Sequence, residues 1–405
     1  MSERPADFAC GPLADLRLIE LGTLIAGPFC GQILGDLGAE VIKVEPPGVG
    51  DPMRGWGSTK TGGKSLWWPV LARNKKAITL DLRQSEGQEL LRQLVGKTDF
   101  LVENFRPGTM EKWGCGYAEL SRVNSGLIMI RVSGYGQTGP YAGQAGFGAI
   151  GEALGGLRYV VGDPSTPPSR VGISIGDSLA ATFAALGALS ALHYRHVSQR
   201  GQVVDSAIYE AVLSMMESLI TEYDKAGFIR ERTGAILPQI APSNVYPTRD
   251  GSLVVIAANQ DTVFTRLVEA MGEPQLAKHS QYSTHAARGL HQRQLDEHLA
   301  GWTRTLGREE LLEKMRTHGV PAGLIYRAPE MLADPHFRAR EAIVSVPHPE
   351  FGDLRMQNVA PKLSQTPGRI RAPSPALGEH NDEIYLRLLG LEPDRYRDLK
   401  QRGII

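Results

Sequence analysis

The sequence is poor in the residues that build disulfide frameworks and metal centres. It has three cysteines, Cys10, Cys30 and Cys115, without a CxxC pair, and its ten histidines are scattered along the chain. An odd number of widely spaced cysteines argues against a disulfide framework and favours a reducing compartment. The histidine spacings match no metal site. We therefore expect a cytoplasmic protein that binds no metal.

Long apolar runs and an excess of one charge are also lacking. Residues 1–11 contain Glu3 and Asp7 and no apolar core, so we expect no signal peptide. The apolar run at residues 179–192 is shorter than a membrane span. Basic and acidic residues number 44 each, whereas nucleic-acid binders and membrane-surface binders carry a basic excess. We predict that the protein binds neither nucleic acid nor membrane.

The common cofactor and nucleophile motifs are missing as well. The sequence contains no P-loop, HExxH or GxSxG. Residues 134–139 fit a loose GxGxxG, but Pro140 and Tyr141 follow where a dinucleotide-binding helix should begin. We interpret this stretch as a tight loop after a strand, and we expect no tightly bound cofactor.

The pattern of apolar residues predicts an α/β protein with more than one domain. Strand-like segments alternate with helix-like segments such as 28–37 and 84–96, which favours a largely parallel sheet covered on both faces. A length of 405 residues exceeds one ordinary core, and residues 226–233 are charged and irregular like a linker. A different unit follows, with a strand expected at 251–258 and a helix at 261–271. The strands expected before the linker are residues 16–21, 40–44, 77–82, 100–102, 127–132 and 202–204.

One acid stands directly before an Ala-rich segment that should be helical. Asp177 follows Gly176 and precedes residues rich in Ala and Leu. The N–H groups and the dipole at a helix start would favour an ionised carboxylate, as attack on a thioester carbonyl requires. Gly176 would let a ligand approach the backbone closely. An acid at this place is usually only a helix cap, so the residues alone leave both interpretations open.

Several motifs taken together resemble the family III CoA-transferases, the CaiB–BaiF group. They are LGTLIAGP at 21–28, GAEVIKVE at 38–45, RNKK at 73–76, VENFRPG at 102–108, SGYGQTGP at 133–140 and the Gly176-Asp177 pair. Their order and spacing match from about Pro12 to the end of the chain. The resemblance implies a large Rossmann-like domain built from residues 1–225 and 329–405, with a smaller α+β domain at 226–328. It also implies an interlocked homodimer.

The resemblance implies a mechanism for Asp177. In that family the matching residue attacks an acyl-CoA carbonyl to form a mixed anhydride, and the released CoA thiolate converts the anhydride into an aspartyl-CoA thioester. A carboxylic acid then accepts the CoA, so acyl-CoA and a carboxylic acid are the implied substrates. Arg83, Arg106 and Lys112 could contact CoA phosphates. The positions that match the family's CoA contacts are Ile25, Ala26, Leu80, Arg83, Asn104, Phe105, Arg106, Lys112 and Phe147.

The same comparison suggests the substrates. Ile25 replaces a glutamine of the oxalate-specific formyl-CoA transferases, which disfavours oxalate. Residues 103–113 and 127–141 look most like succinyl-CoA-dependent enzymes for malate, citramalate or glutarate. We therefore predict CoA transfer from succinyl-CoA to a small dicarboxylate. Arg54 and Arg170 are candidates for binding the distal carboxylate of the acid, and Trp56, Trp67 and Trp68 are candidates for walls of the acyl pocket.

Two other functions are considered. An α-methylacyl-CoA racemase resembles the same family, but it needs two opposed bases and carries a His-Asp pair where this chain has Phe147-Gly148. A CoA-binding protein without turnover would not require Asp177. Both alternatives are therefore less favoured than CoA transfer.

Overall fold

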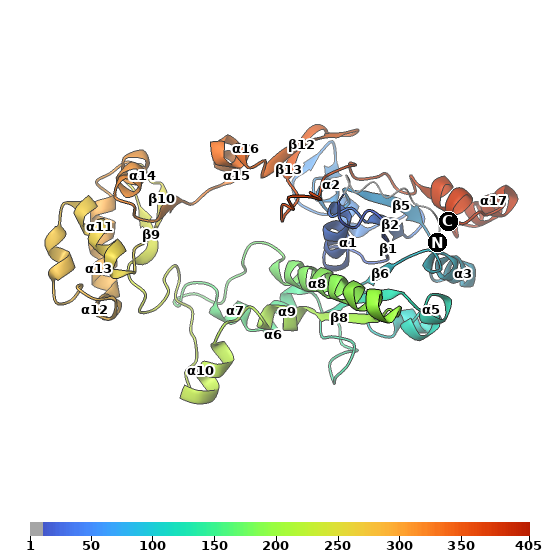
Figure 1. Ribbon diagram of the computed structural model, residues 1–405, viewed down its shortest axis with the longest axis horizontal. Coiled ribbons are helices and arrows are strands. Elements are labelled where there is room, and N and C mark those ends of the chain that lie inside the picture. Colours follow the sequence, from blue (N-terminus) through green and yellow to red (C-terminus); the bar gives the residue numbers. More distant parts are fainter. Residues whose placement is uncertain (1–10) are drawn as a thin grey trace. The chain divides into compact units, whose positions relative to one another are not determined.

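The computed structural model describes residues 11–405. Residues 1–10 lie outside that part, and with them Cys10 and most of the segment that we expect not to be a signal peptide. The chain divides into two compact units (Figure 1). Unit 1 contains the residues up to Arg158 together with Val171–Ala226 and Arg338–Ile405. Unit 2 contains Tyr159–Arg170 and Gly227–Phe337. Unit 1 therefore draws on three separate stretches of the chain.

A six-stranded parallel sheet forms the centre of unit 1. The strands run in the order β5-β2-β1-β6-β7-β8, which is the Rossmann order 3-2-1-4-5-6 when they are numbered along the chain. Nearly every residue of the central strands is buried, as expected when helices cover both faces of a sheet. The predicted α/β fold with a parallel sheet is confirmed. The strands are β1 (Arg17–Glu20), β2 (Glu40–Glu45), β5 (Lys75–Thr79), β6 (Phe100–Glu103), β7 (Ile128–Ser133) and β8 (Val203–Ala207).

The end of the chain completes the core of this sheet. The apolar face of α3 (Ser85–Val95) packs in one cluster with side chains from β1, β6 and β7. Tyr385 and Ile405 belong to the same cluster. The Tyr385 hydroxyl donates to the Thr79 carbonyl over 2.7 Å, and the Asp81 N–H donates to the Ile404 carbonyl over 2.8 Å. The π-helical segment η4 (Asp382–Leu388) and α17 (Pro393–Gln401) are therefore parts of unit 1 that its core requires.

The longest helix, α8 (Ile175–Ser198), packs against α1 (Ala26–Asp36) and against β7 and β8. Alanines such as Ala180, Ala184 and Ala188 line its buried side and allow close approach. By length and composition alone this helix could cross a membrane, which differs from our expectation that the apolar run is too short. A single such helix is weak support for a span, and the packing of α8 is that of a core helix.

The other elements of unit 1 are short and connect or flank the sheet. They include two antiparallel strand pairs, β3–β4 and β12–β13. These elements are η2 (Pro52–Gly55), β3 (Lys60–Thr61), β4 (Lys64–Ser65), α2 (Trp68–Leu71), α4 (Thr109–Lys112), α5 (Tyr117–Val123), α6 (Gly148–Leu154), α9 (Ile208–Leu213), α10 (Leu219–Ala226), β12 (Ile343–His348) and β13 (Gly352–Gln357). Helices α7 (Leu157–Val160) and α16 (Pro335–Ala339) span the points where the chain passes from one unit to the other.

Unit 2 is an α+β unit with its own core. An antiparallel sheet in the order β11-β10-β9 packs with helices through side chains such as Ile256, Phe264 and Leu299. The strand expected at 251–258 and the helix expected at 261–271 are both present. The elements are β9 (Ser243–Pro247), β10 (Leu253–Ala257), α11 (Asp261–Met271), η3 (Pro274–Lys278), α12 (His285–Leu290), α13 (Gln292–Thr303), α14 (Arg308–Thr317), β11 (Ala322–Leu324) and α15 (Ala328–Ala333).

Candidate active site

The carboxyl edge of the parallel sheet brings several of the predicted residues together. Strand β1 has β2 on one side and β6 on the other, so the chain order reverses between β1 and β6. Open α/β sheets bind ligands at such a switch point, outside the carboxyl ends of the strands. Ile25 and Ala26 follow β1, and Asn104 follows β6 directly. The predicted CoA contacts on these two loops therefore lie where the topology favours a ligand.

Asn104 holds the loop after β1 from the β6 side. Its Oδ1 accepts a hydrogen bond from the Thr23 N–H over 2.8 Å, and its Nδ2 donates to the Thr23 carbonyl over 2.9 Å. A Cβ at Gly22 would lie only 3.1 Å from this amide oxygen, so the close approach requires glycine there. Asn104 thus fixes the backbone of the loop through its side-chain amide. The contact with CoA that the sequence predicts for Asn104 would come in addition to this role.

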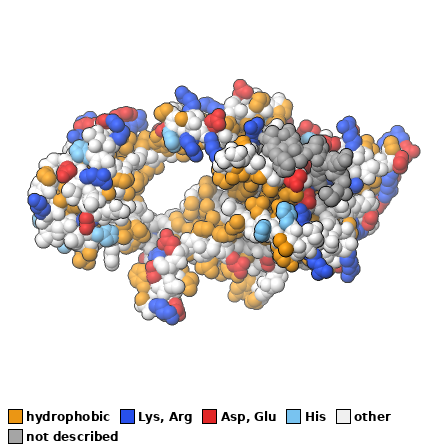
Figure 2. Space-filling view, in the orientation of Figure 1, with side chains coloured by type: hydrophobic (Ala, Val, Ile, Leu, Met, Phe, Trp, Pro, Cys, Tyr) orange, Lys and Arg blue, Asp and Glu red, His pale blue; other side chains and the backbone are white. Residues whose placement is uncertain are grey.

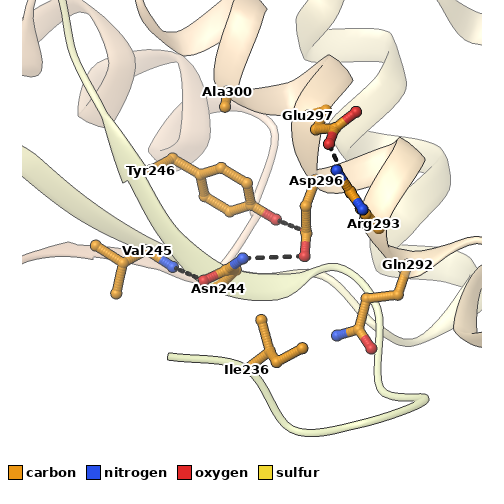
Figure 3. Close-up of a pocket in the computed structure, with 9 residues that line it drawn as sticks. All are labelled: Ile236, Asn244, Val245, Tyr246, Gln292, Arg293, Asp296, Glu297 and Ala300. Carbon is orange, nitrogen blue, oxygen red and sulfur yellow. Dashed lines mark hydrogen bonds and ion pairs between the residues drawn. The ribbon is translucent and has the colours of Figure 1, made fainter. Parts of the chain in front are cut away.

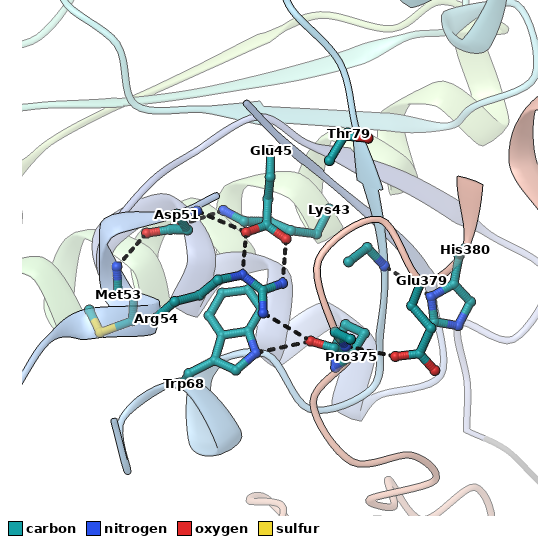
Figure 4. Close-up of polar contacts among 12 residues, drawn as sticks. Lys43, Glu45, Asp51, Met53, Arg54, Trp68, Thr79, Pro375, Glu379 and His380 are labelled. Atoms are coloured by element: carbon teal, nitrogen blue, oxygen red, sulfur yellow. Dashed lines mark hydrogen bonds and ion pairs between the residues drawn. The ribbon is translucent and has the colours of Figure 1, made fainter. Parts of the chain in front are cut away.

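A buried group of charges that includes Lys43, Glu45 and Asp51 (Figure 4) holds the same loop from the β2 side. Asp51 accepts the Leu24 N–H over 3.1 Å, and Leu24 has the positive φ of 63° that side chains other than glycine rarely adopt. Lys43 pairs with Asp51 at 2.7 Å and also donates to the Gly22 carbonyl. Burial alone would lower the pKa of Lys43, but the charges of Glu20 and Asp51 outweigh it and raise that pKa.

The buried charges balance one another. Glu20 is fully buried and lies 3.2 Å from Lys43 and 2.7 Å from Lys75. Arg54 binds both carboxylate oxygens of Glu45. Together with Asp51 the group contains three acids and three bases, and a low-dielectric interior tolerates charges only when they are paired in this way. The network is a rigid support for the loops at the sheet edge.

Arg54, a candidate for binding the distal carboxylate, is engaged inside this network. Besides its bidentate pair with Glu45, its guanidinium lies 3.8 Å from the ring centre of Trp68. Arg54 Nη1 and Trp68 Nε1 both donate to the Pro375 carbonyl, over 3.2 and 3.1 Å (Figure 4). Arg170, the other candidate, belongs to unit 2. These contacts indicate that Arg54 stabilises the packing of this region.

A cavity of about 440 Å³ opens in unit 1 between α1, the segment around α2 and the start of α8. Ile25 and Trp67, both predicted at the site, line it. Trp56 packs edge-on against Trp67 with ring centres 5.9 Å apart, whereas Trp68 is buried beneath. Apolar side chains dominate the lining, and its polar members are Gln32, Ser174, Ser178 and Gln357. The cavity thus offers an apolar wall with neutral hydrogen-bonding groups. Two of these groups, Ser174 and Ser178, come from the start of α8 on either side of residue 177, although Asp177 itself does not line the cavity.

Asp177 is the third residue of α8 and lies within its first turn, and Ser174 occupies the N-cap position. Its side chain is half-buried and rests against the backbone of Gly148, the first residue of α6. A Cβ built on Gly148 would lie 2.8 Å from Cγ of Asp177 and closer still to Oδ2. Glycine at 148 therefore makes the space that the Asp177 carboxylate occupies.

The remaining predicted residues differ in how far a ligand could reach them. Leu80 has a buried side chain in the main core, and its N–H donates to the Glu45 carbonyl over 2.8 Å, which leaves its own carbonyl for any ligand contact. Arg83 is exposed and pairs with Asp81 at 2.9 Å. Phe105 packs edge-on against Trp113. The remaining side chains, those of Arg106, Lys112 and Phe147, are exposed.

Sequence reasoning missed several residues that shape this region. Glu152 of α6 accepts the N–H of Gly176 and pairs with Arg158 at 2.8 Å. Lys43 and Asp51 form the buried support described above. No sequence signal separates such residues from surface charges, because their partners come from other elements. Among residues 11–405, no cluster of His, Cys, Asp or Glu is arranged to hold a metal ion.

Unit 2 contains a separate cavity of about 490 Å³ (Figure 3). Within it Asp296 accepts hydrogen bonds from the Tyr246 hydroxyl at 2.5 Å and from Asn244 Nδ2 at 2.9 Å. Burial raises the pKa of Tyr246, and it raises the pKa of Asp296 as well. These contacts tie β9 to α13, and the polar side chains satisfy one another. We interpret the arrangement as structural.

Unit 1 therefore defines a Rossmann-like α/β protein with an accessible carboxylate near the carboxyl edge of its sheet. The family model of CoA-transferase family III matches residues 13–381, and the chain belongs to that family. It is a CoA-transferase, and CoA thioesters are the substrates of such enzymes. The prediction of the family and of the enzyme class is confirmed.

Three similar proteins illustrate the relationship. The chain is 60% identical over 394 residues to a succinyl-CoA–D-citramalate CoA-transferase of Chloroflexus aurantiacus, covering 97% of this chain and 98% of the relative. It is 40% identical to the beta subunit of a succinyl-CoA–L-malate CoA-transferase of the same organism, covering 97% and 98%. A crystal structure of a CAIB/BAIF family protein from Brucella suis superposes with a TM-score of 0.84 at 32% identity, covering 93% of this chain and 99% of that chain.

Proposed function

We propose that the enzyme transfers CoA from succinyl-CoA to a small dicarboxylic acid of the citramalate or malate type, with Asp177 as its nucleophile. The observation that carries the proposal is the placement of Asp177: an accessible carboxylate that rests on Gly148 in the first turn of α8. The names of the relatives, at 60% and 40% identity, support the choice of substrates.

The proposed reaction keeps an activated acyl bond throughout. A carboxylate oxygen of Asp177 attacks the thioester carbonyl, the C–S bond breaks, and a mixed anhydride forms as the CoA thiolate leaves. The thiolate then attacks the aspartyl carbonyl and releases the donor acid, which leaves an aspartyl-CoA thioester. An acceptor carboxylate repeats these steps in reverse and regenerates Asp177. The protein contributes proximity, because a bound nucleophile at the correct distance removes most of the entropic cost.

CoA would lie along the carboxyl edge of the sheet. Its phosphates would meet the exposed cations Arg83, Arg106 and Lys112, and its thioester end would reach Asp177. Ile25 and Ala26 would contact it from the loop after β1, Asn104 and Phe105 from the loop after β6, and Leu80 through its backbone. Phe147 is exposed just before Gly148 and would cover the reacting end.

A racemase is disfavoured by the same geometry. That reaction needs a second base opposite the first. Gly148 has no side chain, and the Asp177 carboxylate fills the space that a side chain at 148 would need. Phe147 stands where racemases carry the histidine, and its side chain is not a base, so the Phe147-Gly148 pair supplies no second base.

We further propose that the active form is a cytoplasmic homodimer, in which the domain at 226–328 and the return of residues 329–405 to the large domain allow two chains to interlock. Unit 1 exposes large apolar side chains on α8, α9 and α10 and in the turn between α9 and α10, part of which is visible in Figure 2. Exposed apolar patches of this kind mark interfaces. The exposed side chains include Leu186, Leu213, Met215, Ile220 and Tyr223.

Mass spectrometry after mixing the enzyme with a panel of acyl-CoAs tests the proposal. We expect succinyl-CoA to leave a CoA adduct on the peptide that contains Asp177, and we expect Asp177→Ala to lose the adduct and the exchange while still binding CoA. Exchange by Asp177→Ala would refute the mechanism, and adduct formation only with monocarboxylic acyl-CoAs would refute the substrate assignment. Light scattering of the same samples distinguishes a homodimer from a monomer.

A further inference from the structure

A side chain from another helix supplies the hydrogen-bond acceptor at the start of α8. The first N–H groups of a helix have no acceptor within the helix, and a side chain at the N-cap usually supplies one. Ser174 occupies that position but makes no side-chain cap hydrogen bond. Instead Oε1 of Glu152, on α6, accepts the N–H of Gly176 over 3.4 Å. Gly176 directly precedes Asp177, so this contact acts on the backbone that carries the carboxylate.

Glu152 is built into its place. It is only 2% exposed, and its Oε2 accepts a hydrogen bond from Arg158 Nε at 2.8 Å. A Cβ at Gly176 would lie 3.0 Å from Cγ of Glu152, so the acid also packs against the Gly176 backbone. Because 3.4 Å is long for a hydrogen bond, this packing matters as much as the acceptor. Arg158 compensates the buried charge, which would otherwise be costly.

Helix α6 contacts the start of α8 at two successive turns. Gly148 lies beneath the Asp177 carboxylate, and Glu152 lies beneath the preceding peptide group. Residues four apart on a helix share one face, so both contacts come from the same side of α6. One contact sets the position of the carboxylate and the other sets the backbone from which it projects.

We propose that Glu152 is a positioning residue for the nucleophile: by capping and packing against Gly176, it holds Asp177 at attacking distance from the thioester. This inference rests on the proposed role of Asp177. Glu152 touches neither substrate nor the reacting atoms, so its removal should slow the covalent step and leave acyl-CoA binding unchanged.

Two conservative variants separate position from charge. Glu152→Gln keeps the length of the side chain and an acceptor oxygen, whereas Glu152→Asp keeps the charge but withdraws it by about 1.5 Å, one carbon–carbon bond. We expect Glu152→Gln to stay within roughly threefold of the wild-type kcat, and Glu152→Asp to lose on the order of 100-fold, since displacements near 1 Å cost that much. The KM for acyl-CoA should stay within about twofold in both, as expected for an effect on the chemical step.

The control is Glu40→Ala. Glu40 begins β2, at the opposite end of the sheet strands, and its carboxylate pairs with Arg17 at 2.6 Å and Lys76 at 2.7 Å. This change removes a partly buried ion pair of the same unit without touching α6 or α8. We expect it to lower the melting temperature while kcat remains at the wild-type value.

The readout is the rate at which the CoA adduct appears on the Asp177 peptide, measured by rapid quench and mass spectrometry beside kcat and melting temperature. Slow adduct formation in Glu152→Asp, rescued in Glu152→Gln, supports the inference. A wild-type rate of adduct formation in Glu152→Asp overturns the inference. So does a kcat that falls in parallel with the melting temperature in both Glu152→Asp and the Glu40→Ala control, because lost stability would then explain the loss of activity. Absence of any adduct in the wild-type enzyme overturns the proposed function, which is a separate result.

Discussion

Substituting Gly148→Ala adds one methyl group where the Asp177 carboxylate lies. The new Cβ would be 2.8 Å from Cγ of Asp177, whereas ordinary contact begins at 3.4 Å. The added atom would also be closer still to Oδ2, so the carboxylate must move by about 1 Å, and a displacement of this size costs on the order of 100-fold in rate, or ~2.7 kcal/mol. Alanine favours the helix more than glycine does, so α6 itself should not be destabilised.

The assay is steady-state CoA transfer with the adduct rate measured in parallel. We expect kcat to fall while the KM for acyl-CoA is unchanged, because the added methyl group acts on the nucleophile alone. Gly143→Ala is the matched control: Gly143 lies in the loop before α6, and nothing stands within 4 Å of a Cβ there. If Gly148→Ala transferred CoA at the wild-type rate, the carboxylate could not occupy the position that we assign to it.

Three further results are expected. Asp51→Asn should destabilise unit 1 by about 3–5 kcal/mol in denaturant unfolding because it leaves Lys43 buried without full compensation; an unchanged midpoint would contradict the role of the buried charges. Burial alone would raise the pKa of Glu40, but contacts with Lys76 and Arg17 outweigh burial and lower it. The free energy of folding that Glu40 contributes is therefore present above its unfolded pKa of about 4.3 and is lost as pH falls through the lower folded pKa. The difference in unfolding free energy between wild type and Glu40→Gln should therefore shrink in acid, and a constant difference would refute this sign. Trp67→Ala should raise the KM for the acceptor acid by roughly tenfold without affecting CoA binding, because the apolar contact of the Trp67 ring with the acid is lost. Equal effects on the KM of both substrates would argue against a pocket for the acid beside α8.

The sheet could be predicted from the sequence because most of its strands contain a short apolar run between helical segments. The helix Asp261–Met271 was predicted at its observed bounds, since its buried residues recur at helical spacing. Asp177 was placed at the start of a helix, and the structure moves it from the cap to the first turn. Local patterns of this kind determine elements and their ends.

The residues that hold the candidate site in place could not be predicted from local patterns in the same way. Lys43 alternates with apolar residues in β2 and would be assigned to a solvated face, yet it is fully buried because acids from other elements surround it. In the sequence Gly148 stood out only as part of the Phe147-Gly148 pair that replaces the His-Asp of racemases. Only the folded chain shows that the space beside Gly148 is filled by a residue 29 positions later in the sequence. Contacts between distant segments determine these roles, and no local pattern records them.

The burial of Tyr385 and Ile405 in the core of the parallel sheet has a consequence for how the protein is made. A ribosome releases residues 382–405 after every other segment that contributes to this core, so unit 1 cannot close its core until these residues have emerged. The stretch Gly227–Phe337, which supplies nearly all of unit 2, emerges earlier and can begin to fold before residues 382–405 have packed against the sheet. During synthesis the apolar side chains of β1, β6 and β7 in this cluster therefore lack part of their cover until the final segment emerges, and transiently exposed apolar surface of this kind favours aggregation.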